Sequence, residues 1–198
     1  MILQQSFYTR DDVVLIAREL LGKVLYSSFN GIKTAGIITE TEAYAGAVDK
    51  ASHAFNGRRT ARTEIMFRMG GTAYVYLCYG VHSLFNVVTS VEGIPHAVLI
   101  RSVKPAEGIE TMKQRTGKLV IGIREGKGPG NVSKLLGIHF SQSGWPLVSK
   151  TGDLHGDSLW IEDAGISIDP SLIISGPRVG VEYAGEDALL PYRFRITL

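Results

Sequence analysis

Cysteine is almost absent from the 198-residue sequence, and long apolar runs are absent altogether. The single Cys78 excludes an intramolecular disulfide and argues against a thiolate zinc cluster. Because Cys78 stands in an apolar strand pattern, we expect a buried structural thiol. No apolar run approaches the ~20 residues of a membrane span, and the N-terminus lacks the charged start and apolar stretch of a signal peptide. These absences predict a cytoplasmic protein.

An excess of charge of one sign is missing as well, since the formal net charge is only +2. The distribution is uneven, however. Residues 50–68 hold five cations (Lys50, Arg58, Arg59, Arg62 and Arg68) against the single anion Glu64. Such a patch is compatible with phosphate contacts, and it is equally compatible with a solvated surface loop.

The chain shows no repeat, no low-complexity tract and no linker, so we expect one domain over residues 1–198. Strand patterns follow one another instead of alternating with long helices, which predicts an α+β fold with a mainly antiparallel sheet. Asn30-Gly31 and Gly80 mark two hairpin turns. Strands are expected at 25–28, 34–41, 72–79, 83–90 and 97–103, and helices at 9–21, 107–114 and 131–136.

Two glutamates stand near the end of the second predicted strand. Side chains alternate along a strand, so Glu40 and Glu42 should share one face at about 7 Å from each other. That separation would suit the acid and base of an inverting glycoside hydrolase. Either glutamate could instead bind backbone amides or an arginine. Glu42 is the better catalytic candidate because it lies nearer the loop.

Tyrosines gather at the hairpin centred on Gly80. Tyr74 and Tyr76 share a strand face, and Tyr74 alone reads as a core aromatic. Tyr79 stands at the turn, where an aromatic ring is costly to leave in water. It is either an ordinary rim aromatic or a wedge between stacked bases. Together with Glu42 and His53, the tyrosines suit a site for a planar aromatic ligand such as a nucleobase.

Taken together, the motifs of the sequence closely resemble those of the alkyladenine (3-methyladenine) DNA glycosylases. The resemblance runs in order over nearly the whole chain. It rests on Glu-Thr-Glu-Ala-Tyr (40–44), Ala-Ser-His (51–53), Gly-Arg-Arg-Thr-Ala-Arg (57–62), Met66-Phe67, Tyr-Val-Tyr-Leu-Cys-Tyr-Gly (74–80), Asn86, Leu-Ile-Arg (99–101), Pro-Ala-Glu-Gly (105–108) and Arg-Val-Gly-Val-Glu-Tyr-Ala-Gly (178–185).

The resemblance implies a monofunctional glycosylase with a curved sheet, flanking helices and a protruding hairpin. Such an enzyme flips damaged purines (3-methyladenine, 7-methylguanine, hypoxanthine or ethenoadenine) out of duplex DNA and leaves an abasic site. By this match Glu42 activates the water, while Arg101 and the Val179 carbonyl help to hold it. Tyr44, His53 and Tyr76 hold the base, Asn86 crowds the 2-amino group of guanine, and Tyr79 fills the gap in the duplex.

Two of these residues, and one further segment, also have simpler interpretations from the sequence alone. Asn86 could be a strand-end amide bonded to backbone, and His53 a polar loop residue. Residues 128–134 could present helix-start amides to a phosphate or only cap a helix.

Phosphate contacts are expected from Arg58, Arg59, Arg62 and Lys134. The resemblance implies no metal and no cofactor, and we expect a monomer whose partner is double-stranded DNA. A carbohydrate glycosidase using Glu40 and Glu42, or a binding module that does not cut, remain the alternatives.

Overall fold

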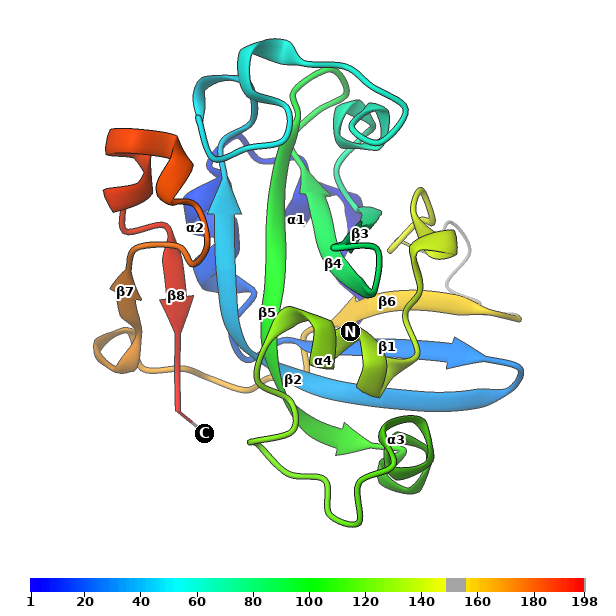
Figure 1. Cartoon of the computed structure of the whole chain (residues 1–198). Coiled ribbons are helices and arrows are strands. Elements are labelled where there is room, and N and C mark those ends of the chain that lie inside the picture. The colour runs from blue at the N-terminus through cyan, green and yellow to red at the C-terminus, as the bar shows by residue number, and fades with distance from the viewer. Residues whose placement is uncertain (149–155, 198) are drawn as a thin grey trace.

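One antiparallel sheet curls through the domain and carries most of its contacts (Figure 1). The computed structural model describes residues 1–148 and 156–197. The main path runs β3 (Thr72–Cys78), β4 (His82–Thr89), β5 (His96–Glu107), β2 (Ile32–Tyr44), β1 (Val24–Phe29) and β6 (Ser158–Glu162). On the other side, β8 (Arg193–Arg195) pairs with β2 and with β7 (Ile174–Gly176). The predicted α+β, single-domain class with a curved antiparallel sheet is confirmed.

The curl comes from the two longest strands, β2 and β5. Their pairing is interrupted by register shifts at Ala35/Gly36 and on both sides of Glu40. Irregularities of this kind increase the local twist and bend a strand. As a result β2 begins in one half of the sheet, where it pairs with β1, and continues into the other, where it pairs with β8 (Figure 1).

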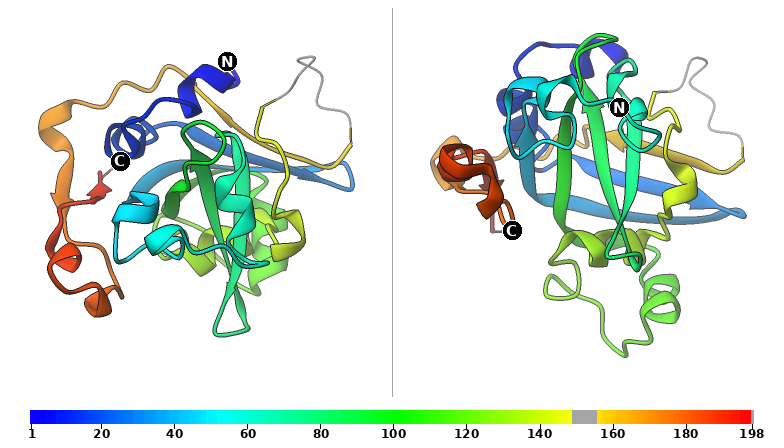
Figure 2. Two further views of the ribbon diagram at one scale, coloured as in Figure 1. Left: turned by 90° about the horizontal axis from the view of Figure 1, so that it is seen from above. Right: turned by 45° about the horizontal axis from the view of Figure 1, so that its top comes forward.

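Both predicted hairpin turns are present. Asn30-Gly31 joins β1 to β2 with φ values of 52° and 74°. Tyr79-Gly80 begins the turn between β3 and β4 with φ values of 51° and 71°. Two consecutive residues at positive φ match the twist of the flanking strands. The β3–β4 hairpin protrudes from the domain, as Figure 2 shows in the view from above.

The helices are few and short, and all three predicted helices start at a different residue than expected. The first, expected at 9–21, is α2 (Val13–Glu19), which begins later because Asp12 caps it by accepting a hydrogen bond from Leu15 N at 2.9 Å. The short α1 (Gln5–Tyr8) precedes it and was not predicted. The helix expected from Glu107 is α3 (Ile109–Thr116), since β5 continues to Glu107. The last predicted helix is α4 (Pro129–Leu136). Six 3₁₀ turns are described: η1 (Gly46–Val48), η2 (Phe55–Gly57), η3 (Glu64–Phe67), η4 (Phe140–Gln142), η5 (Pro170–Leu172) and η6 (Glu182–Leu189).

Alternation along the strands separates the core from the candidate site. Ala73, Val75, Phe85, Val87, Val98 and Ile100 point into the main core with α2 and α4. Their neighbours Tyr74, Tyr76, Asn86, Leu99 and Arg101 point to the opposite face, where they line a cavity. The core therefore fixes the strands that carry the site. Within the described ranges, no helix combines the length and apolar character needed to cross a bilayer.

Candidate functional site

A cavity of about 430 Å³ opens on the polar face of β3, β4 and β5. Its size falls within the range of small-molecule sites. Four other segments complete it: the end of β2, residues 51–66, the N-terminus of α4 and the C-terminal segment at 179–183. Most predicted site residues line it, namely Tyr44, His53, Arg62, Tyr76, Tyr79, Asn86, Arg101 and Val179.

Glu42 lies directly behind this lining and has no exposed surface. Three lining residues contact its carboxylate. Val179 N donates to Oε1 at 2.8 Å, the Tyr44 hydroxyl donates to Oε2 at 2.8 Å, and Arg101 Nε lies 3.3 Å from Oε1. A carboxylate offers about four lone-pair positions. One position therefore remains for a further donor arriving from the cavity.

The environment of Glu42 makes it more basic than an ordinary glutamate. Burial raises the pKa of Glu42, and Arg101, the Val179 amide and the Tyr44 hydroxyl oppose that rise. Burial, together with the charge of Glu42, also raises the pKa of Tyr44, so this hydroxyl stays protonated and donates. A raised pKa is typical of carboxylates that accept a proton during catalysis.

Glu40 has a different set of contacts, although it shares the strand face as predicted. Its Oε1 accepts hydrogen bonds from Arg193 Nε at 2.7 Å and from Arg101 Nε at 3.2 Å. Arg101 therefore bridges the two glutamates. Glu40 anchors these two arginines at the strand end, which supports its structural interpretation.

The aromatic walls are locked together by edge contacts. The His53 ring packs against Tyr76 with centroids 4.7 Å apart and planes at 79°. His53 Nδ1 and the Tyr74 hydroxyl are 2.9 Å apart. Burial and the nearby Arg62 and Arg58 lower the pKa of His53 to about 4, and burial raises the pKa of Tyr74 to about 12. At neutral pH both groups are therefore uncharged, and one hydrogen bond between Nδ1 and the Tyr74 hydroxyl orients the imidazole ring.

Tyr74 thus has a second role besides the predicted core packing. It is buried, as expected, and it also lines the cavity and orients His53.

Asn86 likewise combines both of its interpretations. Its Nδ2 donates to the carbonyls of Tyr74 and Leu84 at 3.1 and 3.2 Å, and the side chain still borders the cavity. These bonds hold the Asn86 amide in one orientation.

Tyr79 stands at the tip of the β3–β4 hairpin with 93% of its surface exposed. Its φ of 51° is unusual for a bulky residue, because Cβ crowds the backbone in this region. An exposed ring on a strained turn contributes nothing to packing. Residues held in this way are typical of functional sites.

The predicted phosphate-binding cations are not equivalent. Arg62 lines the cavity, and its guanidinium carbon lies 5.7 Å from the Tyr76 ring centroid. Arg59 is bound to Glu64 at 2.8 Å and stacks on Phe67. Arg58 and Lys134 are exposed and lie outside the lining. Residues 128–134 start α4 as expected, and Pro129 reaches the cavity edge.

Sequence reasoning misplaced one residue and missed three. Cys78 is half-buried and lines the cavity instead of being fully buried, because β3 leaves the core as it enters the protruding hairpin. Asp49, Arg178 and Tyr183 were given no role. Asp49 and Arg178 form a buried ion pair, and the exposed Tyr183 hydroxyl donates to the Ala51 carbonyl at 3.0 Å. Among residues 1–148 and 156–197, no group of three or more histidine, cysteine or acidic side chains is arranged to hold a metal.

Comparison with known proteins identifies the family of the chain. The family described as "Methylpurine-DNA glycosylase (MPG)" matches residues 6–198. The chain belongs to the methylpurine-DNA glycosylase family. It is 45% identical over 194 residues to a protein of Bacillus mycoides, covering 96% of this chain and 93% of the relative. It is 42% identical over 198 residues to a protein of Chlamydia abortus, covering 98% and 97%. Both relatives carry the name "Putative 3-methyladenine DNA glycosylase". The predicted family and enzyme class, a hydrolase of N-glycosyl bonds, are therefore confirmed.

Proposed function

We propose that this protein releases alkylated purines from duplex DNA by flipping the damaged nucleotide into the cavity and hydrolysing its N-glycosyl bond. The observation that carries the proposal is the buried Glu42, which three hydrogen-bonding or charged groups hold directly behind an aromatic cavity. Membership of the methylpurine-DNA glycosylase family supports the assignment of that cavity to a purine.

The chemistry needs only a base and a water. As the bond between C1′ and the purine nitrogen breaks, its electron pair stays with the purine and positive charge grows on the sugar. Water oxygen bonds to C1′, and one of its protons passes to Glu42. The negative carboxylate also stabilises the developing sugar cation. Arg101 and Val179 border the cavity where the water would meet Glu42, which supports their role in holding it.

Cationic purines are the preferred leaving groups in this mechanism. Departure of the electron pair turns a cationic base such as 3-methyladenine into a neutral molecule, so no acid is required. A neutral base such as hypoxanthine would need a proton. His53 cannot supply it at neutral pH because its pKa is lowered to about 4. We therefore expect cationic lesions to be released faster than neutral ones.

Tyr44, Tyr76 and His53 supply the walls for the flipped base, through stacking and cation–π attraction. Asn86 supplies selectivity against guanine. Its amide is fixed by two backbone carbonyls, so it cannot turn away from a purine that carries a 2-amino group. Tyr79 enters the space that the flipped nucleotide leaves.

The phosphate contacts follow from exposure and charge. Arg62 at the cavity edge is the first candidate, followed by Arg58 and Lys134, whereas Arg59 is already paired with Glu64. We further propose that the protein acts as a monomer.

The test is release of free base under single-turnover conditions. Duplexes carry 3-methyladenine, 7-methylguanine, hypoxanthine, ethenoadenine or unmodified guanine, and products are separated by chromatography. The expected result is rapid release of the methylated purines, slower release of neutral lesions and negligible release of guanine. Tight binding of a damaged duplex without any free base would contradict the proposal and support a binding module. Sugar release from oligosaccharides would support the glycosidase.

A further inference from the structure

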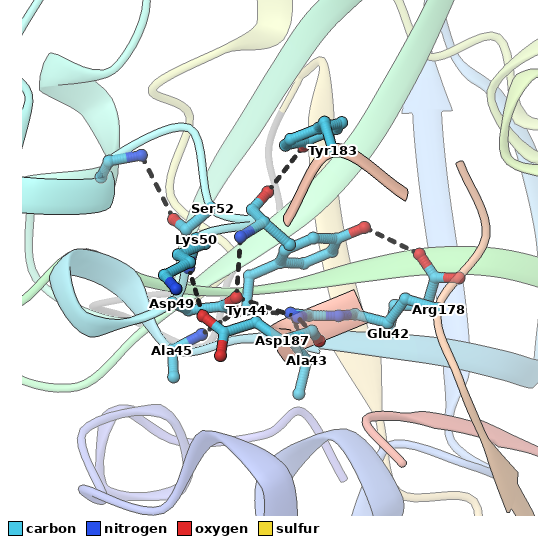
Figure 3. Close-up of polar contacts among 12 residues, drawn as sticks. Glu42, Ala43, Tyr44, Ala45, Asp49, Lys50, Ser52, Arg178, Tyr183 and Asp187 are labelled. Carbon is cyan, nitrogen blue, oxygen red and sulfur yellow. Dashed lines mark hydrogen bonds and ion pairs between the residues drawn. The ribbon is translucent and has the colours of Figure 1, made fainter. Parts of the chain in front are cut away.

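The C-terminal segment is tied to the loop that carries His53 by three contacts between residues far apart in the sequence (Figure 3). The first is the ion pair of Arg178 with Asp49, whose side chains are 0% and 1% exposed. The second is the hydrogen bond from the Tyr183 hydroxyl to the Ala51 carbonyl at 3.0 Å. The third is the hydrogen bond from Lys50 N to Asp187 Oδ2 at 2.8 Å. We call Asp49, Arg178 and Tyr183 the clasp.

Arg178 binds three segments at once. Nη1 donates to the Ala43 carbonyl at 2.8 Å and to Asp49. Nη2 donates to Asp49 Oδ1 at 2.9 Å and to the Asp187 carbonyl at 3.0 Å. The planar fork of an arginine suits such a set of fixed acceptors, which a lysine could not satisfy. The end of β2, the following loop and η6 are thereby joined through one guanidinium.

Asp49 shapes the loop from the other side. Its Oδ2 accepts from Ala45 N at 3.0 Å, and its Oδ1 accepts from Ala51 N at 2.9 Å. The carboxylate therefore holds the loop between Tyr44 and His53 in a compact turn by binding backbone amides on both sides of Asp49. These two residues are the walls that the proposed function assigns to the flipped base.

Two further contacts connect the clasp to Glu42. Val179, the residue after Arg178, donates its N–H to Glu42 Oε1 at 2.8 Å. The Arg178 guanidinium carbon also lies 4.8 Å from the Tyr44 ring centroid, and the Tyr44 hydroxyl donates to Glu42 Oε2. Both hydrogen-bond donors on Glu42 are therefore held in place by Arg178.

Stability alone is a weak reason for this pair. Burying two charges costs several kcal/mol in desolvation, and apolar side chains of similar volume often serve stability as well or better. Arg178 Nε also has no hydrogen-bond partner among the described residues, which adds to the cost. The contacts converge instead on residues 42–44, 51–53 and 179, which border or support the cavity.

We propose that Arg178, Asp49 and Tyr183 are positioning residues, which set the Val179 amide and the Tyr44 hydroxyl on Glu42 and hold the base-binding loop against them. Neither Arg178 nor Asp49 lines the cavity, so they act through other residues. Tyr183 does line the cavity, and its hydrogen bond to the Ala51 carbonyl is the contact through which it positions the loop. The inference rests on the proposed function, because it assigns the clasp to the same reaction.

Asp49→Asn, Arg178→Lys and Tyr183→Phe test the proposal through single-turnover release of 7-methylguanine from duplex DNA. Asp49→Asn should lower the rate roughly 100-fold, because displacements of about 1 Å have effects of that size. The release rate of Arg178→Lys should lie between those of Asp49→Asn and wild type. Tyr183 lies on the exposed side, so Tyr183→Phe should fold normally. Its release rate should fall about 2- to 10-fold, which is the effect of one hydrogen bond.

A second readout separates positioning from simple destabilisation. Titration of Glu42 followed by carbon NMR should show a higher pKa in Arg178→Lys, because the Val179 amide is held less firmly on the ionised form. The charges around Glu42 are kept in this variant: residue 178 stays cationic, and Arg101, Glu40 and Asp49 are unchanged. Asp49→Asn does not suit this readout, since loss of the Asp49 charge would itself lower the pKa of Glu42. Met112→Ala, in the core outside the cavity lining, is the control for lost stability and should leave the Glu42 pKa unaltered.

Wild-type release rates in folded Asp49→Asn and Tyr183→Phe, together with an unshifted Glu42 pKa in Arg178→Lys, would overturn the clasp. If Asp49→Asn does not fold, Arg178→Lys and Tyr183→Phe decide the question by the same two readouts. Absence of release from the wild type would instead contradict the proposed function, and the Glu42 titration would still show whether the clasp holds Val179 in place.

Discussion

The buried carboxylate and the hairpin tip are opposite in character, although both belong to one site. Glu42 is 0% exposed and contacts Val179, Tyr44 and Arg101. Tyr79 is 93% exposed and is held at a φ of 51°. Bond cleavage needs fixed charges away from water, whereas opening a duplex needs an apolar group that protrudes into it. Under the proposed function, we therefore expect chemistry and DNA opening to be carried by separate parts of the site.

The largest effect should come from removing the charge of Glu42. Glu42→Gln keeps the shape of the side chain but cannot accept the proton of water, so release should fall by ~10²–10⁴-fold. Binding of the damaged duplex should change little. Glu40→Gln is the matched control on the same strand face, and single-turnover release should fall far less. Equal losses in the two variants would remove the distinction between the glutamates.

The tip should show a smaller effect of a different kind. Tyr79→Gly removes the ring and relieves the positive φ, so lesion flipping and release should fall about 10- to 100-fold, the contribution of one stacked aromatic. Thermal stability should stay equal or rise by up to ~1 kcal/mol. Asn30→Gly is the control, because Asn30 has a φ of 52° in the other hairpin. It should leave release unchanged, and a similar loss there would argue against a specific role for Tyr79.

The pH dependence should also follow the buried carboxylate and not the tip. Glu42 must be ionised to accept a proton, and burial raises its pKa. Release by the wild type should therefore decline on acidification with a midpoint above the ordinary value of ~4.3. His53 stays neutral over this range because its pKa is about 4. Tyr79→Gly should show a lower rate with the same midpoint, and a shifted midpoint would couple the two regions.

The smallest expected effect concerns stability. Because the pKa of Glu42 is raised in the folded protein, its contribution to stability is fully present below the unfolded pKa and is lost as pH rises through the folded value. Glu42→Gln has no such titration. The difference between the Tm of Glu42→Gln and that of wild type should therefore rise by a few degrees between about pH 4 and pH 7. A difference that does not vary with pH would mean that burial costs the ionised Glu42 little.

Local features of the chain were predictable from the sequence. Asn30-Gly31 and Tyr79-Gly80 were placed in turns because few residues accept positive φ, and the shared face of Glu40 and Glu42 followed from strand alternation. The start of α2 was not predicted correctly, since Thr9, Asp11 and Asp12 all suit a helix cap and only the folded chain selects Asp12.

Contacts across the fold were not predictable in this way. Asp49 and Arg178 are separated by 129 positions, and neither residue stands in a pattern that indicates burial. Cys78 was misplaced because its apolar strand continues beyond the edge of the core. The role of Tyr74 in orienting His53 depends on a contact between segments 21 residues apart. Only the three-dimensional arrangement reveals these relations.

The most direct test records flipping and release on one duplex, which carries 7-methylguanine beside a fluorescent base analogue. Wild type should give a fluorescence change followed by free base. Glu42→Gln should keep the fluorescence change and lose the free base, whereas Tyr79→Gly should lose both in proportion. Loss of the fluorescence change in Glu42→Gln, or its retention in full by Tyr79→Gly, would contradict the separation of chemistry from DNA opening.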